Sequence, residues 1–96
     1  MELIKLRPKL HILVCVNQRE NESCCKNADG EKIYLKLKKF VNTNNLSSIV
    51  WITKTRCLGF CNDEGTTIVI YPEGIWLKKI KEQDINKIIE LIKSKI

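Results

Sequence analysis

Cysteine is the residue type in this chain that is best suited to demanding chemistry. Five cysteines occur in 96 residues, at positions Cys15, Cys24, Cys25, Cys57 and Cys61. Four cysteine thiolates are the usual ligands of [2Fe–2S] and [4Fe–4S] clusters. The chain also contains one histidine, His11, and one methionine, Met1, but no glycine-rich phosphate loop. The cysteines are therefore the candidate site, and the other residues offer little for catalysis.

Other uses of cysteine compete with an iron–sulfur cluster. Structural zinc also takes four cysteines, usually with two to four residues between paired ligands. Cys57 and Cys61 match that spacing, whereas eight residues separate Cys15 from Cys24. A dithiol enzyme needs Cys-x-x-Cys and a Rieske centre needs two histidines, and neither occurs. Inert packing suits Cys15 alone. The spacing favours iron–sulfur, with zinc and redox-active or inert thiols left open.

Length and composition indicate one folded domain spanning residues 1–96. Hydrophobic residues make up 44% and charged residues 29% of the chain, as in folded globular proteins. No apolar run approaches the roughly 18 residues that span a bilayer. The first residues lack the long apolar stretch of a signal peptide. We therefore expect a cytoplasmic protein with no membrane partner, whose cysteines bind metal rather than form disulfides.

The formal net charge is +6, which indicates either an acidic partner surface or simply a solvated basic surface. The lysines are spread over both predicted helices and the final predicted strand. They are not gathered with exposed aromatic residues into a nucleic-acid-binding stripe. We therefore expect no nucleic-acid partner.

Hydrophobic patterning predicts an α/β fold in which four strands form a mixed sheet beside two helices. Ile33, Leu37 and Val41 recur at helical spacing, whereas the β-branched runs are short and typical of strands. Asp29 is a candidate helix cap. The predicted strands are residues 11–17, 48–53, 66–71 and 75–80, and the predicted helices are 31–42 and 82–95. The order is β-α-β-β-β-α.

This order explains how distant cysteines could converge. The first strand, helix and second strand form a right-handed βαβ unit, so the two strands should be parallel neighbours. Cys15 lies near the carboxyl end of the first strand, and Cys57 lies just beyond that of the second. Open α/β sheets usually bind ligands at this edge. The segments that follow should bring Cys24 or Cys25, and also Cys61, back to the same edge.

Four sequence segments together resemble the thioredoxin-like [2Fe–2S] ferredoxins. They are residues 11–17, Ser23 with Cys24, residues 57–61 and residues 68–76, which end in Tyr-Pro-Glu-Gly-Ile-Trp. The likeness extends from about His11 to the last helix. It implies a thioredoxin-like fold and an electron carrier rather than an enzyme. Such proteins are often homodimers and are similar to the small iron–sulfur subunit of respiratory NADH dehydrogenases. The ligands it implies for one [2Fe–2S] cluster are Cys15, Cys24, Cys57 and Cys61.

The sequence departs from the family pattern at two places. Cys25 stands where the family usually has a small residue; the Ser-Cys match favours Cys24, and Cys25 could replace it if Cys24 were lost. Gly65 is followed by Thr66 rather than by proline. The loop between the first two ligands is also shorter than usual.

The resemblance implies a low-potential, one-electron carrier for redox partner proteins. An iron–sulfur assembly carrier and a zinc-binding interaction module are the alternative functions. Backbone amides near Gly59 and Phe60 are candidate donors to cluster sulfur. Arg19 and Arg56 flank predicted ligands, where they either steer an acidic partner or are simply solvated.

The two predicted helices should lie on one face of the sheet. The other face then needs a covering partner, so we expect a homodimer through the sheet. Trp51 and Trp76 lie in predicted strands and are expected in the core or at this contact. His11 opens a strand, where a structural or exposed position is expected.

Overall fold

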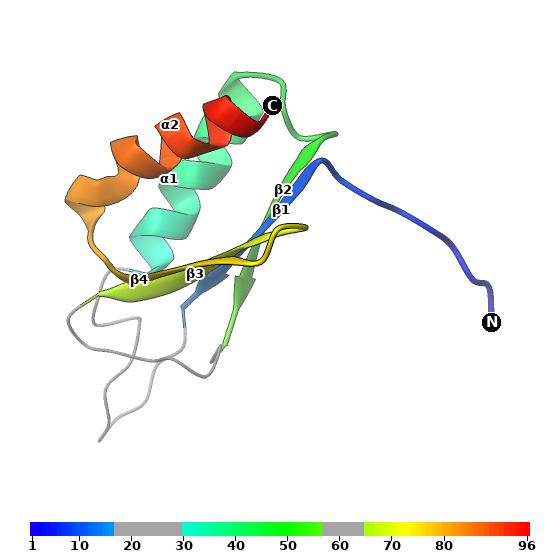
Figure 1. Cartoon of the computed structure of the whole chain (residues 1–96), viewed down its shortest axis with the longest axis horizontal. Helices are drawn as coiled ribbons and strands as arrows, with labels where there is room; N and C mark the ends of the chain where they lie inside the picture. The colour runs from blue at the N-terminus through cyan, green and yellow to red at the C-terminus, as the bar shows by residue number, and fades with distance from the viewer. Residues whose placement is uncertain (17–29, 57–64) are drawn as a thin grey trace.

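The computed structural model describes residues 1–16, 30–56 and 65–96 (Figure 1). Within them, the elements follow the predicted β-α-β-β-β-α order, with one 3-10 turn before the last helix. The bounds are β1 Leu10–Cys15, α1 Gly30–Thr43, β2 Val50–Thr55, β3 Thr66–Tyr71, β4 Ile75–Ile80, the 3-10 turn η1 Glu82–Asp84, and α2 Ile85–Lys95. The predicted four-stranded sheet with two helices is confirmed.

The strands form one mixed sheet in the order β2-β1-β3-β4. β1 is parallel to β2, which confirms the predicted βαβ unit, and it is antiparallel to β3. β3 and β4 are antiparallel partners joined by the Pro72-Glu73-Gly74 turn. Gly74 has φ of 74°, a left-handed conformation that glycine adopts without steric cost. The sheet therefore places β1 between a parallel and an antiparallel neighbour.

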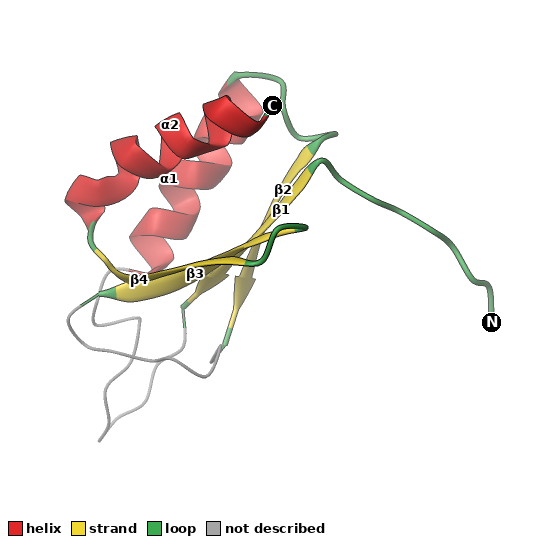
Figure 2. Cartoon of the chain, viewed as in Figure 1, coloured by secondary structure: helices red, strands yellow, loops and turns green. Residues whose placement is uncertain are grey.

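Both helices cover the same face of the sheet (Figure 2). α1 buries Ile33, Leu37 and Val41, each four residues after the last, and α2 buries its own isoleucine stripe. Alternate residues of the strands meet these helices, as the twofold periodicity of a strand requires. The core consists of Leu10, Ile12, Val14, Ile33, Leu37, Val41, Val50, Ile52, Ile68, Ile70, Ile80, Ile85, Ile88 and Ile92.

The second strand begins two residues later than predicted. A turn closes α1, in which the Leu46 amide donates to the Val41 carbonyl at 2.9 Å. The amides of Ile49 and Val50 both donate to the Leu46 carbonyl, at 3.0 and 2.8 Å. Ser48 and Ile49 therefore belong to this turn, although their β-branched neighbours favour a strand. The strand continues instead to Thr55.

The final predicted helix is divided in two. Residues 82–84 form η1, and α2 begins at Ile85. The Lys81 amide donates to Asp84 Oδ2 at 3.0 Å, while the Asp84 amide donates to the Lys81 carbonyl at 2.9 Å. This reciprocal pair closes a tight turn before the regular helix starts.

The sheet face opposite the helices carries aromatic, aliphatic and polar side chains, and no described helix covers it (Figure 2). The register aligns its side chains in two rows, Trp51–His11–Tyr71 and Thr53–Leu13–Val69–Trp76. His11 Nε2 lies 2.9 Å from Thr53 Oγ1, and its ring meets Trp51 edge-on at 5.6 Å. Tyr71 and Trp76 are each 42% exposed. We call this surface the open face.

Candidate metal centre

Cys15 is the last residue of β1 and is fully buried. It is absent from the core between sheet and helices, whose β1 members are Leu10, Ile12 and Val14. Strand alternation therefore assigns Cys15 to the side of the open face, at the carboxyl end of the strand. The sequence-based placement of Cys15 at that edge is confirmed.

The Cys15 sulfur contacts the backbone at the end of β2. Its Sγ donates a hydrogen bond to the carbonyl oxygen of Arg56 at 2.9 Å. The parallel register pairs Cys15 with Thr55, and the Val16 amide donates to the Thr55 carbonyl at 2.9 Å. Arg56 immediately precedes Cys57, and consecutive Cα atoms are about 3.8 Å apart. The chain therefore enters the segment with the next two predicted ligands directly from the group that Cys15 contacts.

The start of β3 meets the same edge. Thr66 is fully buried, and its Oγ1 donates to the Cys15 carbonyl oxygen at 2.7 Å. The residue before it, Gly65, packs against β4 so closely that a Cβ would lie 2.2 Å from the Lys79 carbonyl carbon. Only glycine fits there without a backbone shift. Arg56 and Thr66 therefore both contact Cys15, the first at its sulfur and the second at its carbonyl oxygen.

The other predicted ligands, Cys24, Cys57 and Cys61, lie outside the described residues, as does Cys25. The same holds for Asp29, Arg19, Gly59 and Phe60, so these predictions stay predictions. Within residues 1–16, 30–56 and 65–96, no group of three or more His, Cys, Asp or Glu side chains could hold a metal. This agrees with the sequence, because Cys15 is the one cysteine in those ranges.

Basic side chains lie at the carboxyl end of β2. Lys54 Nζ is 3.6 Å from Glu31 Oε1 and 5.5 Å from the centre of the Tyr34 ring, which joins β2 to the start of α1. Arg56 is exposed at the end of the strand. Lys54 is thus paired on the helix side of the sheet, and Arg56 gives the carboxyl end of β2 an exposed basic side chain.

Thr66 and the Arg56 carbonyl are the site groups that the sequence did not reveal. A threonine that opens a strand is common, and a backbone carbonyl has no signature in the residue types. The hydrogen bond from Thr66 joins residues 51 positions apart, so it depends on the register between β1 and β3. The unusual Gly65-Thr66 pair was the one available signal.

Comparison with known proteins relates this arrangement to a family. The 2Fe-2S ferredoxin of Clostridium pasteurianum is 32% identical over 88 residues, which cover 88% of this chain and 85% of that protein. The chain belongs to the 2Fe-2S ferredoxin family. The 2Fe-2S ferredoxin of Aquifex aeolicus is 30% identical over 84 residues, covering 83% and 75% of the two chains. No protein-family model matches the sequence.

Solved structures place this ferredoxin among those with a thioredoxin-like fold. The wild-type thioredoxin-like [2Fe–2S] ferredoxin from Aquifex aeolicus superimposes with a TM-score of 0.76 at 26% identity. The match covers 88% of this chain and 84% of that one. A Cys-to-Ser variant of the same Aquifex protein gives a TM-score of 0.75 at 27% identity, covering 84% and 83%. The fold predicted from the family resemblance is therefore confirmed.

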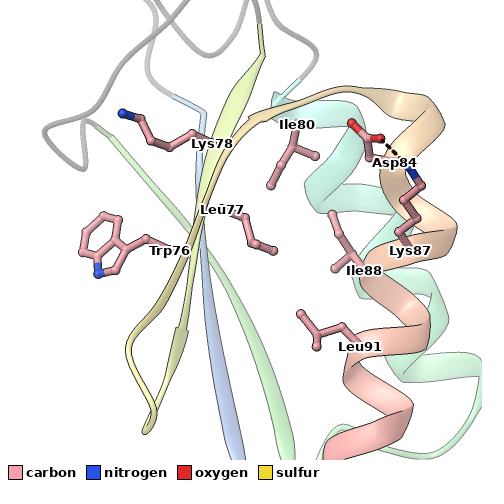
Figure 3. A pocket seen from close by; sticks show the side chains of 8 residues that line it. All are labelled: Trp76, Leu77, Lys78, Ile80, Asp84, Lys87, Ile88 and Leu91. Atoms are coloured by element: carbon pink, nitrogen blue, oxygen red, sulfur yellow. Dashed lines mark ion pairs between the residues drawn. The ribbon is translucent and has the colours of Figure 1, made fainter.

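The ferredoxin also has a groove between β4 and α2 (Figure 3). The groove measures about 500 Å³, and Leu77, Ile80, Ile88 and Leu91 point into the space between the two elements. Trp76 and Lys78 project from the opposite side of β4 (Figure 3). The groove contains no cysteine, so it is separate from the candidate metal centre.

No helix in the described part of the ferredoxin is long and apolar enough to cross a membrane.

Proposed function

We propose that this chain is a single-domain carrier, residues 1–96, that moves one electron through one [2Fe–2S] cluster held by Cys15, Cys24, Cys57 and Cys61. The observation that supports it best is the 2.9 Å contact between Cys15 Sγ and the carbonyl of Arg56, the residue before Cys57. A four-cysteine donor set suits this cluster type. The site residues that can be described therefore fit the group.

The chain's own residues prepare the first ligand. A cysteine binds iron as the thiolate, so Cys15 gives up the proton that its Sγ now donates to Arg56. The Thr66 hydroxyl donates a hydrogen bond to the Cys15 carbonyl oxygen and so holds the end of β1 in place. Arg56, exposed at the end of β2, supplies positive charge at the edge that carries the proposed anionic centre. When bound, the cluster supplies reversible one-electron chemistry, near roughly −400 mV for all-cysteine [2Fe–2S] proteins of the plant type.

The proposed partners are redox proteins with an acidic docking surface, because the chain has a net charge of +6. We propose a cytoplasmic location, since a reducing compartment keeps cysteines available as ligands. No substrate site is proposed, because a carrier exchanges electrons with other proteins and transforms no bound molecule. Nucleic acid and membrane are not proposed as partners.

We also propose a homodimer formed through the open face. Its support is the contrast between the two faces of the sheet, since α1 and α2 both cover one of them (Figure 2). Sedimentation of the protein at micromolar concentration should give a dimer. Trp76→Glu should weaken the dimer, because it places a charge on the open face, whereas Leu35→Glu on exposed α1 surface should leave it intact. A monomeric wild-type protein would contradict the proposal.

A redox titration combined with a transfer assay separates a carrier from the alternatives. The anaerobically purified protein should be red-brown, titrate as a one-electron couple at about −400 mV, and keep its cluster when mixed with an apo-acceptor. Rapid, complete loss of the cluster to the acceptor would favour an assembly role instead. A colourless protein containing zinc would favour an interaction module and overturn the proposal.

A further inference from the structure

Residues 1–9 form an extended arm that leaves the body of the molecule at the start of β1 (Figure 1). Met1, Leu3, Ile4 and Leu6 are all strongly exposed, and Leu3 retains 85% of its accessible surface. Four large apolar side chains in one short segment are unusual for a surface that faces only water. The arm therefore needs a covering surface beyond its own chain.

The direction of the arm indicates where that surface lies. The helices cover one side of the sheet, and the arm extends on the other side (Figure 1). It points away from its own open face, so it cannot cover that face within the same molecule. A second copy that packs against the open face would therefore lie beside the arm.

The area of the open face supports this arrangement. Four strands of six residues make a rectangle of roughly 19 by 20 Å, or about 400 Å² in projection. Stable interfaces bury about 800 Å² from each partner. The open face is small, and part of it is already buried, since Val69 is 0% exposed. Nine extended residues reach up to about 30 Å, long enough to cross a whole sheet and enlarge the contact.

We infer that in the homodimer each arm lies across the partner subunit and covers the exposed aromatic end of its open face, at Tyr71 and Trp76 of the partner subunit. The inference rests on the homodimer proposed above. In a twofold dimer both arms make the same contact, so every contact between an arm and the partner subunit occurs twice. The chain thus supplies both apolar surfaces, the exposed arm and the half-exposed aromatic pair.

The charge pattern of the arm specifies which side chains bind. Ile4 and Leu6 alternate with Lys5 and Arg7, which gives an extended segment one apolar edge and one basic edge. The described open-face residues include no carboxylate that the basic edge would pair with. The contact should therefore be apolar and nearly independent of salt. Attraction to an anionic membrane would instead weaken strongly with salt.

The test compares two arm variants of the cluster-loaded, full-length protein. The triple variant Leu3→Ser, Ile4→Ser and Leu6→Ser removes three apolar side chains of the arm, and the double variant Lys5→Ser with Arg7→Ser is the control that removes charged ones. Sedimentation from sub-micromolar to high micromolar concentration should show the dimer weakened at least about tenfold in the triple variant. The control should match wild type at low and high salt. Cluster content should be equal in all three proteins.

Tryptophan emission gives a second readout, because both tryptophans of the chain, Trp51 and Trp76, lie on the open face. The triple variant should emit at longer wavelength than wild type, and the control should not. Equal dimer affinity in wild type and triple variant would overturn the arm contact and leave the homodimer standing. A monomeric wild type would overturn both. Salt-sensitive binding of the arm to anionic phosphatidylserine vesicles without dimerisation would also overturn the proposed arm contact.

Discussion

At the scale of single residues, two backbone carbonyls determine how Cys15 is presented. Its sulfur contacts the carbonyl of Arg56, and its own carbonyl accepts the hydroxyl of Thr66. Both contacts come from neighbouring strands rather than from β1. The first proposed ligand is therefore positioned by the sheet, before any metal is bound.

Alanine substitutions should distinguish Cys24 from Cys25. Cys25→Ala should keep the full iron content and an unchanged visible spectrum, because Cys24 is the proposed ligand. Cys24→Ala should lower the cluster content or alter the spectrum, and the double variant should bind no stable cluster. Iron analysis and absorbance of anaerobic preparations measure this. Loss of the cluster in Cys25→Ala, with retention in Cys24→Ala, would reverse the assignment.

Thr66→Val should destabilise the sheet edge around Cys15 while keeping the size of the side chain at position 66. The substitution leaves the Cys15 carbonyl without its hydroxyl donor in a fully buried position. The free energy of unfolding should fall by about 1–2 kcal/mol, and chelators should bleach the cluster faster. Denaturant unfolding and the rate of absorbance loss measure both effects. Thr43→Val makes the same chemical change at an exposed helix end, and equal behaviour of the two variants would contradict the role of Thr66.

At the scale of elements, turn residues decided how well the sequence predicted the strands. β3 and β4 match their predicted bounds, because Gly65 and Pro72-Glu73-Gly74 separate them clearly from their surroundings. β2 begins two residues later than predicted, since hydrogen bonds from the Ile49 and Val50 amides to the Leu46 carbonyl place Ser48 and Ile49 in a turn. Hydrophobic pattern does not encode such local hydrogen bonds, which arise only once α1 has ended.

The same distinction applies to the candidate site. Topology predicts that β1 and β2 end at one edge, and the structure confirms it. The contacts of Cys15 with Arg56 and Thr66 depend instead on exact pairing between strands far apart in the chain. Residue spacing carries no information about that pairing.

Glu82 links the end of the sheet to α1 and makes stability depend on pH. The hydrogen bond from Lys36, followed by the charge of Lys32, holds the pKa of Glu82 below its ordinary value of 4.5. A lowered folded-state pKa stabilises the fold above the unfolded pKa, and this contribution is lost as the pH falls through the lowered value. The ion pair is exposed, so the effect should be small and weaker in salt.

Glu82→Gln should therefore lower the denaturant midpoint slightly at neutral pH. The difference from wild type should disappear once the pH has fallen below the lowered pKa of Glu82, because the wild-type carboxylate is then also neutral. Urea unfolding at several pH values measures it, with Glu90→Gln on the exposed surface of α2 as the control. A difference that persists at low pH would show that Glu82 acts through packing rather than charge.

At the scale of the whole molecule, the proposed cluster site and the proposed dimer surface lie on different parts of the chain. The carboxyl edge of β1 and β2 carries the proposed cluster site, whereas the open face and the arm are the surfaces proposed to bind a second copy (Figures 1 and 2). The arm departs from the opposite end of β1. A dimer built this way leaves the cluster edge accessible to redox partners.

The most direct measurement is electron paramagnetic resonance of the dithionite-reduced protein, purified without oxygen and assayed for iron and acid-labile sulfide. About two irons and two sulfides per chain are expected, with the signal of a reduced [2Fe–2S] cluster that carries one unpaired electron. A four-iron spectrum would show that the cluster type is wrong. A well-folded protein with neither iron nor labile sulfide, even after reconstitution, would contradict the proposed electron carrier.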